Sequence, residues 1–169
     1  MAAGDRDSAK LLATMMIKWM PPNGSAAMFA VRGVLPYVGL LIHLLSSHCS
    51  TRDHRSLLCR NILAARTFFS EFISQLVRQQ PTILSASSPI ALPSDNGADD
   101  EIYVTTDPTL NFLQLAIRTC QRSNGSSAES QRQARTAFMN LFRRYKTKSE
   151  IVSSPAMNKV LYSWVLVAK

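Results

Sequence analysis

Side chains that could ligate zinc are concentrated in one stretch of the sequence. All three histidines and two of the three cysteines lie between residues 43 and 59. Imidazole and thiolate are the usual zinc ligands, but structural zinc sites commonly contain two cysteines separated by two residues. This stretch has no such pair, so we predict no metal site among His43, His48, Cys49, His54 and Cys59.

The other chemically active residue types also lack a recognisable arrangement. Four carboxylates lie between residues 95 and 101, but their spacing does not match a calcium-binding EF-hand loop. The sequence contains no glycine-rich phosphate loop and no nucleophile motif. We therefore expect a protein that is not an enzyme and that needs no cofactor. The carboxylates are Asp95, Asp99, Asp100 and Glu101.

Positive charge is the strongest compositional feature. The formal net charge is +8, and residues 107–169 alone hold ten basic and three acidic residues, a net charge of +7. Such a surface favours an acidic partner, which could be a protein, a nucleic acid or a lipid headgroup, although a simple solvated helix face would look the same. The basic helix within this segment, residues 132–148, could bind phosphate, but its aromatic residues Phe138, Phe142 and Tyr145 fall on the predicted inner stripe and are not placed to stack on bases. Because the positive charge would still suit a phosphate backbone, we keep nucleic-acid binding by a basic helical protein as the alternative function.

Apolar residues at helical spacing predict an all-α protein. A first helix is expected at residues 7–19, ending before Pro21, and a second is expected from Ser25. Gly33 would allow a close neighbour, and Pro36 would kink or end the second helix. The first helix has a predicted inner face of Leu11, Leu12, Met15, Met16 and Trp19.

Two later helices share a local pattern. A helix at 61–80 and a helix at 128–146 each place an alanine four residues before an aromatic, in matching segments 65–73 and 134–142. Such a match is typical of stacked helical hairpins, although an ordinary amphipathic helix can also produce it. The predicted inner residues are Ile62, Ala65, Phe69, Phe72, Ile73 and Leu76, then Ala134, Ala137, Phe138, Leu141, Phe142 and Tyr145.

Residues 81–106 interrupt the helical pattern and predict a long loop. Within it, the β-branched and aromatic run from Ile102 predicts an extended strand or hairpin arm, with a disordered tether as the alternative. Asp107 and Pro108 then form a helix start, and the helix that follows is apolar almost all round. A last helix is expected from Ser154-Pro155.

No membrane insertion or secretion is expected. The longest apolar run, residues 34–45, is shorter than the roughly 20 residues of a membrane-spanning helix. The first ten residues are polar and charged, unlike a signal peptide, and the three cysteines fit a reducing compartment.

Five segments, taken in order, resemble consecutive blocks of the Golgi to ER traffic protein 4 family. They cover most of the chain outside 39–60 and 81–106, and each is moderately specific. The segments are GDRDSAKLL at 4–12, FAVRGVLPY at 29–37, NILAARTFF at 61–69, PTLNFLQL at 108–115 and FMNLFRRYK at 138–146.

The resemblance implies an α-solenoid of stacked antiparallel helical hairpins in the cytosol. It implies a scaffold for the guided entry of tail-anchored proteins into the ER membrane, which bridges a targeting ATPase and a ubiquitin-like, chaperone-recruiting partner. In the family, the N-terminal half binds the ATPase, and the later helices with an extended arm clasp the N-terminal segment of the ubiquitin-like protein. The chain corresponds to the C-terminal half and looks truncated at both ends, so we expect it not to bind the ATPase.

The resemblance also divides the chain. Residues 1–80 would be helical repeats, 81–106 a loop with the arm, and 107–169 the partner-binding repeats. Residues 39–60 have no counterpart, and we hypothesise a translated intron there; a spliced transcript that keeps these codons rules this out. The expected partner-binding residues are Ile102, Tyr103, Val104, Phe112, Leu115, Phe138, Phe142 and Arg143.

Overall fold

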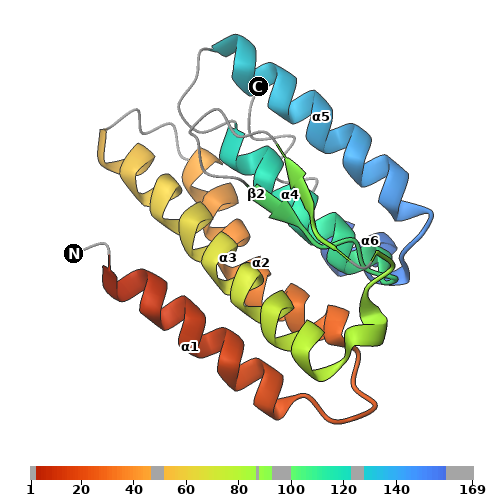
Figure 1. The fold of residues 1–169 in the computed structure, drawn as a ribbon. Coiled ribbons are helices and arrows are strands. Elements are labelled where there is room, and N and C mark those ends of the chain that lie inside the picture. Colours follow the sequence, from red (N-terminus) through yellow and green to blue (C-terminus); the bar gives the residue numbers. More distant parts are fainter. Residues whose placement is uncertain (1–2, 47–51, 87, 93–99, 123–127, 159–169) are drawn as a thin grey trace.

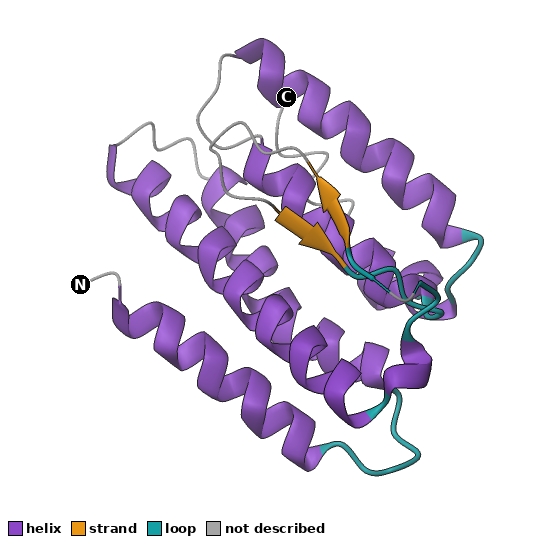
Figure 2. Ribbon diagram, in the orientation of Figure 1, coloured by secondary structure: helices purple, strands orange, loops and turns teal. Residues whose placement is uncertain are grey.

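The computed structural model describes residues 3–46, 52–86, 88–92, 100–122 and 128–158, with the backbone alone at 3–5, 38–46, 52–60, 92, 100, 122, 128, 130 and 131. Helices account for most of this part, and the strands form one small antiparallel hairpin (Figures 1 and 2). The elements are α1 (Ala3–Trp19), α2 (Ala26–Ser46), α3 (Arg52–Gln79), η1 (Pro81–Ile83), β1 (Ile90–Leu92), β2 (Asp100–Ile102), α4 (Pro108–Arg122), α5 (Ala128–Lys146) and α6 (Glu150–Ser153).

Helix α3 is the central element. It packs against α1, α2 and α4, whereas α5 packs against α4 and α6 at the other side of the molecule (Figure 1). All six residues of the predicted α3 stripe are buried. The prediction of an all-α protein is confirmed, while stacking of its helices as an α-solenoid stays a prediction.

The close approach expected at Gly33 is confirmed. A Cβ atom at this position would lie 1.9 Å from Cζ of Phe68, so the ring of Phe68 occupies the space that any side chain would need. Phe68 is fully buried and stacks on Phe72 with ring centroids 5.8 Å apart. Glycine at position 33 therefore sets how closely α2 and α3 can approach each other.

The predicted inner face of α1 is wrong at two of its five positions, Leu11 and Trp19. Leu11 and Trp19 are 61% and 63% exposed, and the fully buried side is formed by Ala9 and Ala13, followed by Ile17. Small side chains let the backbone of α1 approach α3 closely, so the helix buries its alanines and turns two of its largest apolar residues outward. Leu12 and Met16 are partly buried against the core, as expected.

Two helix boundaries also differ from the prediction. Helix α2 continues beyond Pro36 to Ser46, so Pro36 does not end it. Helix α3 begins at Arg52 rather than at residue 61. Residues 40–80 contain neither proline nor glycine, so nothing local opposes a helix on the N-terminal side of residue 61. Whether residues 39–60 are an insertion stays a hypothesis.

The last helices follow the predicted pattern closely. Helix α5 has the predicted bounds and buries Ala134, Phe138 and Phe142, although Ala137 is exposed because α5 is covered on one side. Residues 155–158 are helical, and the hydroxyl of Ser154 accepts a hydrogen bond from the N–H of Met157 at 3.3 Å, as its capping role requires. The short helix α6, which ends just before Ser154, was not expected.

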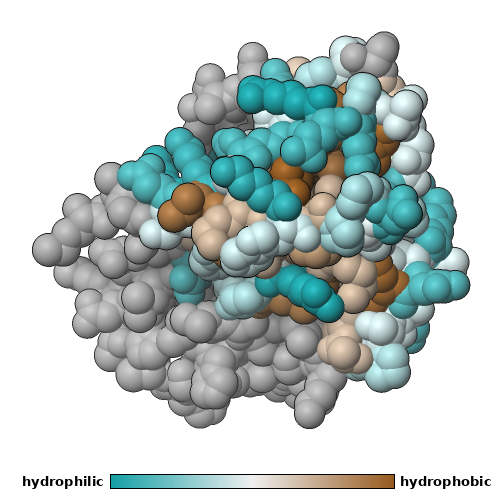
Figure 3. Space-filling model, turned by 90° about the horizontal axis from the view of Figure 1, so that it is seen from below, coloured by the Kyte–Doolittle hydropathy of each residue, from teal (hydrophilic) through white to brown (hydrophobic). Residues whose placement is uncertain are grey.

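Among the residues coloured in Figure 3, hydrophilic ones cover much of the surface, and hydrophobic ones are visible between them. Within the described part of the chain, no helix is long and apolar enough to span a bilayer.

Candidate partner-binding surface

Helix α4 is fixed at its first turn by local hydrogen bonds. The carboxylate of Asp107 accepts from the N–H of Thr109 at 2.7 Å, which confirms the predicted N-cap. The hydroxyl of Thr109 lies 2.7 Å from that of Ser149, and both side chains are buried. Ser149 in turn caps α6 by accepting from the N–H of Val152 at 3.2 Å. The start of α4 is therefore tied to the segment that follows α5.

One face of α4 holds the extended segment 100–105, which we call the arm. The N–H of Thr105 donates to Asn111 Oδ1 at 2.9 Å, and Asn111 Nδ2 donates to the carbonyl oxygen of Thr105 at 2.7 Å. Two residues back along the arm, Tyr103 makes the same pair of bonds with the side-chain amide of Gln114, both at 3.1 Å. Arg118 Nη2 then donates to the carbonyl oxygen of Glu101 at 3.0 Å.

These contacts join two different periodicities. Residues 111, 114 and 118 share one helix face because they are three and four positions apart. Residues 101, 103 and 105 point their main-chain groups to the same edge because a strand has a period of two. The side chains of Asn111, Gln114 and Arg118, which we call the main-chain-binding row, therefore take the place of a neighbouring strand at the edge of the hairpin.

The opposite edge of the arm pairs with residues that precede it in the chain. β1 and β2 pair antiparallel, with Ile90 opposite Ile102. Further along, the N–H of Ser85 donates to the carbonyl oxygen of Val104 at 2.9 Å, and Leu84 bridges to Thr105. The segment predicted as an arm from Ile102 onward is thus extended, with its first residue at the end of β2 and main-chain hydrogen bonds on both edges.

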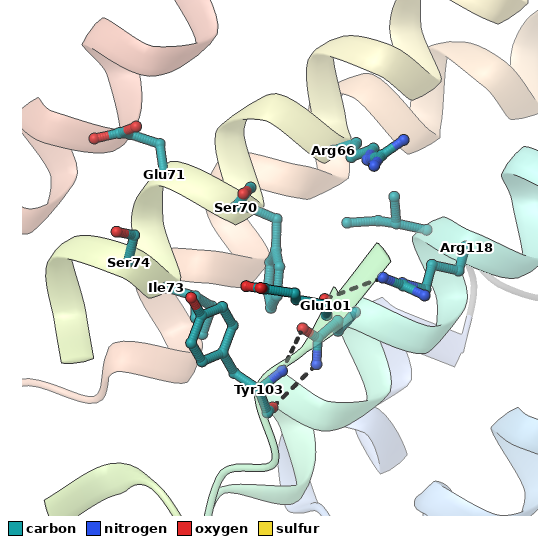
Figure 4. A pocket seen from close by; sticks show the side chains of 11 residues that line it. Arg66, Ser70, Glu71, Ile73, Ser74, Glu101, Tyr103 and Arg118 are labelled. Atoms are coloured by element: carbon teal, nitrogen blue, oxygen red, sulfur yellow. Dashed lines mark hydrogen bonds between the residues drawn. The ribbon is translucent and has the colours of Figure 1, made fainter. Parts of the chain in front are cut away.

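One face of the arm is turned toward α3. Glu101 and Tyr103 line a pocket of about 330 Å³ between α3, the arm and α4. Figure 4 shows the ring of Tyr103 pointing toward Ile73 and Ser74 of α3. Tyr103, predicted to contact a partner, therefore has its ring directed into the protein.

The other face of the arm is apolar and accessible. Ile102 and Val104 share this face because they alternate with Tyr103, and Ile90 joins them because it lies directly opposite Ile102. Ile90 is 50% exposed, while Ile102 and Val104 are half-buried. We call Ile90, Ile102 and Val104 the outer hairpin row. The sequence predicted two of its three members.

The predicted aromatic contact residues form a cluster between α4 and α5. The ring of Phe112 lies 6.3 Å from Phe138, 6.4 Å from Phe142 and 5.9 Å from Tyr145, between centroids. Phe112, Phe138 and Phe142 are at most 2% exposed, so they form the joint between α4 and α5. Leu115 is half-buried and Arg143 is exposed. A role of these residues in partner binding stays a prediction.

The described residues include one titratable group with a clearly shifted pKa, the Cys120 thiol. Burial raises the pKa of the Cys120 thiol to about 12, so the thiolate form is suppressed at neutral pH. No three His, Cys, Asp or Glu side chains gather as a metal site in the part of the chain that the structure describes. Of the residues weighed for zinc, His48 and Cys49 lie outside the described residues, and only the backbone is described at His43, His54 and Cys59.

Sequence reasoning missed the main-chain-binding row. Helix α4 was read as apolar almost all round, and Leu110, Phe112 and Leu113 are indeed buried. The missed signal was the spacing of the polar positions Asn111, Gln114 and Arg118, which marks a single polar stripe on an otherwise apolar helix.

Comparison with known proteins gave one match. A sequence model of a family described as Golgi to ER traffic protein 4 matches residues 1–163. No curated protein and no solved structure matches the chain.

Proposed function

The chain belongs to the Golgi to ER traffic protein 4 family, and from this premise we propose that it is an adaptor in the guided entry of tail-anchored proteins into the ER membrane. It binds the N-terminal segment of a ubiquitin-like partner that recruits chaperones, and in the family's pathway such a complex is bridged to a targeting ATPase. The adaptor works in the cytosol and needs neither a catalytic residue nor a cofactor.

The observation that carries this proposal is the outer hairpin row. Its apolar side chains lie on a hairpin whose far edge is held by three side chains of α4 through main-chain hydrogen bonds. Because these hydrogen bonds already hold residues 101–105 extended, we expect little conformational entropy of this segment to be lost on binding. An apolar segment of the partner can then cover Ile90, Ile102 and Val104 at modest cost.

The other predicted contact residues contribute in two ways. Phe112, Phe138 and Phe142 support the surface from below by fixing α5 against α4. The exposed Arg143 adds positive charge, which orients an acidic segment and raises its association rate. The nucleic-acid alternative finds less support, since Phe138 and Phe142 are buried and Tyr145 is half-buried against Phe112.

Calorimetric titration with the partner's N-terminal segment tests the proposal. We expect the unmodified chain to bind it, and Ile102→Asp to weaken binding at least about tenfold by placing a carboxylate in the apolar contact. Leu11→Asp is the matched control, because Leu11 is an exposed apolar residue on α1, and it should bind like the unmodified chain. Equal binding by both variants would refute the assigned surface.

A further inference from the structure

Helix α5 and the turn after it hold most of the protein's net charge. Residues 128–148 contain six basic residues and one acidic residue, a net charge of +5 out of the total of +8. The acidic residue, Glu129, lies in the first turn, and Arg143, Arg144 and Lys146 lie in the last. Because α5 packs against α4 and α6 on one side, its other side is left for this charge.

The basic residues of α5 are not spread evenly round the helix. Four of them line up along the helix with one methionine at the centre. In chain order these residues are Arg132 (i), Arg135 (i+3), Met139 (i+7), Arg143 (i+11) and Lys146 (i+14). At 100° per residue these five positions fall within about 80° of one another and extend over about 21 Å of helix. We call them the basic row.

Burial supports this arrangement. Arg132, Arg143 and Lys146 are exposed, and Arg135 and Met139 are half-buried. The buried face of α5, formed by Ala134, Phe138 and Phe142, is centred about 100° round the helix from the basic row, so the row borders that face. The Nζ atom of Lys146 lies 6.0 Å from the centroid of the Phe142 ring, which helps hold this lysine along the helix.

The spacing of the basic row is the one by which a helix meets another helix. Positions i, i+3, i+7, i+11 and i+14 form one stripe along a helix, and such a stripe can face a second helix packed side by side with it. A partly accessible methionine at the centre with cations on both sides suits a partner helix that has an apolar residue at its centre and carboxylates near its ends.

Other acidic partners fit less well. An interfacial membrane helix uses its apolar face to enter the bilayer, and the apolar face of α5 is already covered by α4. Single-stranded nucleic acid needs exposed aromatic side chains for stacking, and the basic row has none. We propose that the basic row of α5 is a docking site for an acidic α-helix of a partner protein, separate from the outer hairpin row.

Fluorescence anisotropy with designed peptides tests this proposal at low ionic strength. The probe is a synthetic helical peptide with glutamates at i, i+3, i+11 and i+14 and a leucine at i+7. Its isomer of equal composition and helicity spreads the same glutamates round the helix. We expect the first peptide to bind about tenfold more tightly, because only its carboxylates can meet the whole row at once.

Charge-reversal variants then locate the site. We expect Arg132→Glu and Arg143→Glu each to weaken binding about tenfold, while Arg144→Glu, an exposed neighbour off the row, has a much smaller effect. Circular dichroism confirms that each variant keeps its helices. Equal binding of the two isomers, an equal effect of Arg144→Glu, or tighter binding to phosphatidylserine vesicles or polyuridine overturns the proposal. Arg132→Glu should leave binding at the outer hairpin row intact. The proposal for the basic row can therefore be disproved without disproving the proposed function.

Discussion

The side-chain amide of Gln114 satisfies both main-chain groups of Tyr103. Its Oε1 accepts from the N–H of Tyr103 and its Nε2 donates to the carbonyl oxygen, each at 3.1 Å. A glutamine on a helix thereby makes the two bonds that an antiparallel neighbour would make in a sheet. Asn111 does the same for Thr105, and Arg118 extends the row to Glu101 in β2, so side chains of α4 hold one edge of the arm.

Replacing Gln114 by alanine should loosen the arm. Gln114 is buried, so the change leaves the N–H and C=O of Tyr103 without their partners at a cost of about 1–3 kcal/mol. We expect faster hydrogen exchange at the amides of residues 100–105, measured by mass spectrometry, and a lower denaturation midpoint. Gln133→Ala on the exposed side of α5 is the control and should change neither. Unchanged exchange in the arm of the Gln114 variant would contradict the role assigned to this residue.

The contact between Gly33 and Phe68 predicts a coupled pair. Gly33→Ala puts a methyl group where the ring lies, and overpacking of this kind costs about 1–3 kcal/mol in the free energy of unfolding. In a Phe68→Leu background the same change should cost clearly less, because the smaller side chain frees that space. Urea denaturation of both single variants and the double variant measures this coupling. Additive losses would mean that the two residues do not compete for the same volume.

Cys120 should be inert toward thiol reagents in the folded protein. Its side chain is buried, and burial raises its pKa to about 12. In a Cys49→Ser, Cys59→Ser background, we expect Cys120 to react with a disulfide reagent at pH 8 only as fast as the protein unfolds. Adding denaturant should restore full reactivity. Immediate reaction under native conditions would show that the thiol is accessible.

The same burial predicts a loss of stability in alkali. The unfolded thiol ionises near its ordinary pKa of 9.0, whereas the folded thiol stays protonated up to about 12. Above pH 9 the unfolded state therefore binds fewer protons than the folded state, and stability falls with rising pH. Between pH 9 and 11, the free energy of unfolding should fall less steeply in Cys120→Ala than in the unmodified chain. Parallel pH profiles would rule out this contribution.

The buried hydroxyl pair of Thr109 and Ser149 predicts a measurable coupling between α4 and α6. Their oxygens are 2.7 Å apart, so Ser149→Ala takes away the hydrogen-bond partner of the buried Thr109 hydroxyl at a cost of about 1–3 kcal/mol, whereas Thr109→Ala leaves Ser149 its bond from the N–H of Val152. We expect Thr109→Ala plus Ser149→Ala to lose less stability than the sum of the single variants, as measured by thermal denaturation. A sum without coupling would show that the pair contributes nothing beyond its separate members.

Local signals explain why some elements could be predicted from the sequence. Asp107 and Pro108 cap α4 through bonds within one turn, and α5 has a single uninterrupted apolar stripe. Such features depend on residues close together in the chain, so they can be recognised from the sequence without knowing the tertiary contacts. Helix α1 shows the limit, because its large apolar residues and its alanines form two competing faces, and only the contact with α3 decides between them.

The candidate surface was harder to predict for the same reason. The β-branched run at Ile102 and Val104 indicated an extended arm, and the arm is present. Its orientation depends on bonds to Asn111 and Gln114 on α4, which no local pattern specifies. The prediction therefore found the right segment but could not tell that the ring of Tyr103 faces α3 while Ile102 faces outward.

Site-specific photo-cross-linking tests the central claim most directly. A photoreactive amino acid at Ile90, in the outer hairpin row, should cross-link to the N-terminal segment of the ubiquitin-like partner. The same amino acid at Trp19, which is 63% exposed at the end of α1, should give no product. Cross-linking from Trp19 and none from Ile90 would contradict the account, because the partner would then lie on the opposite part of the molecule from the arm that α4 holds.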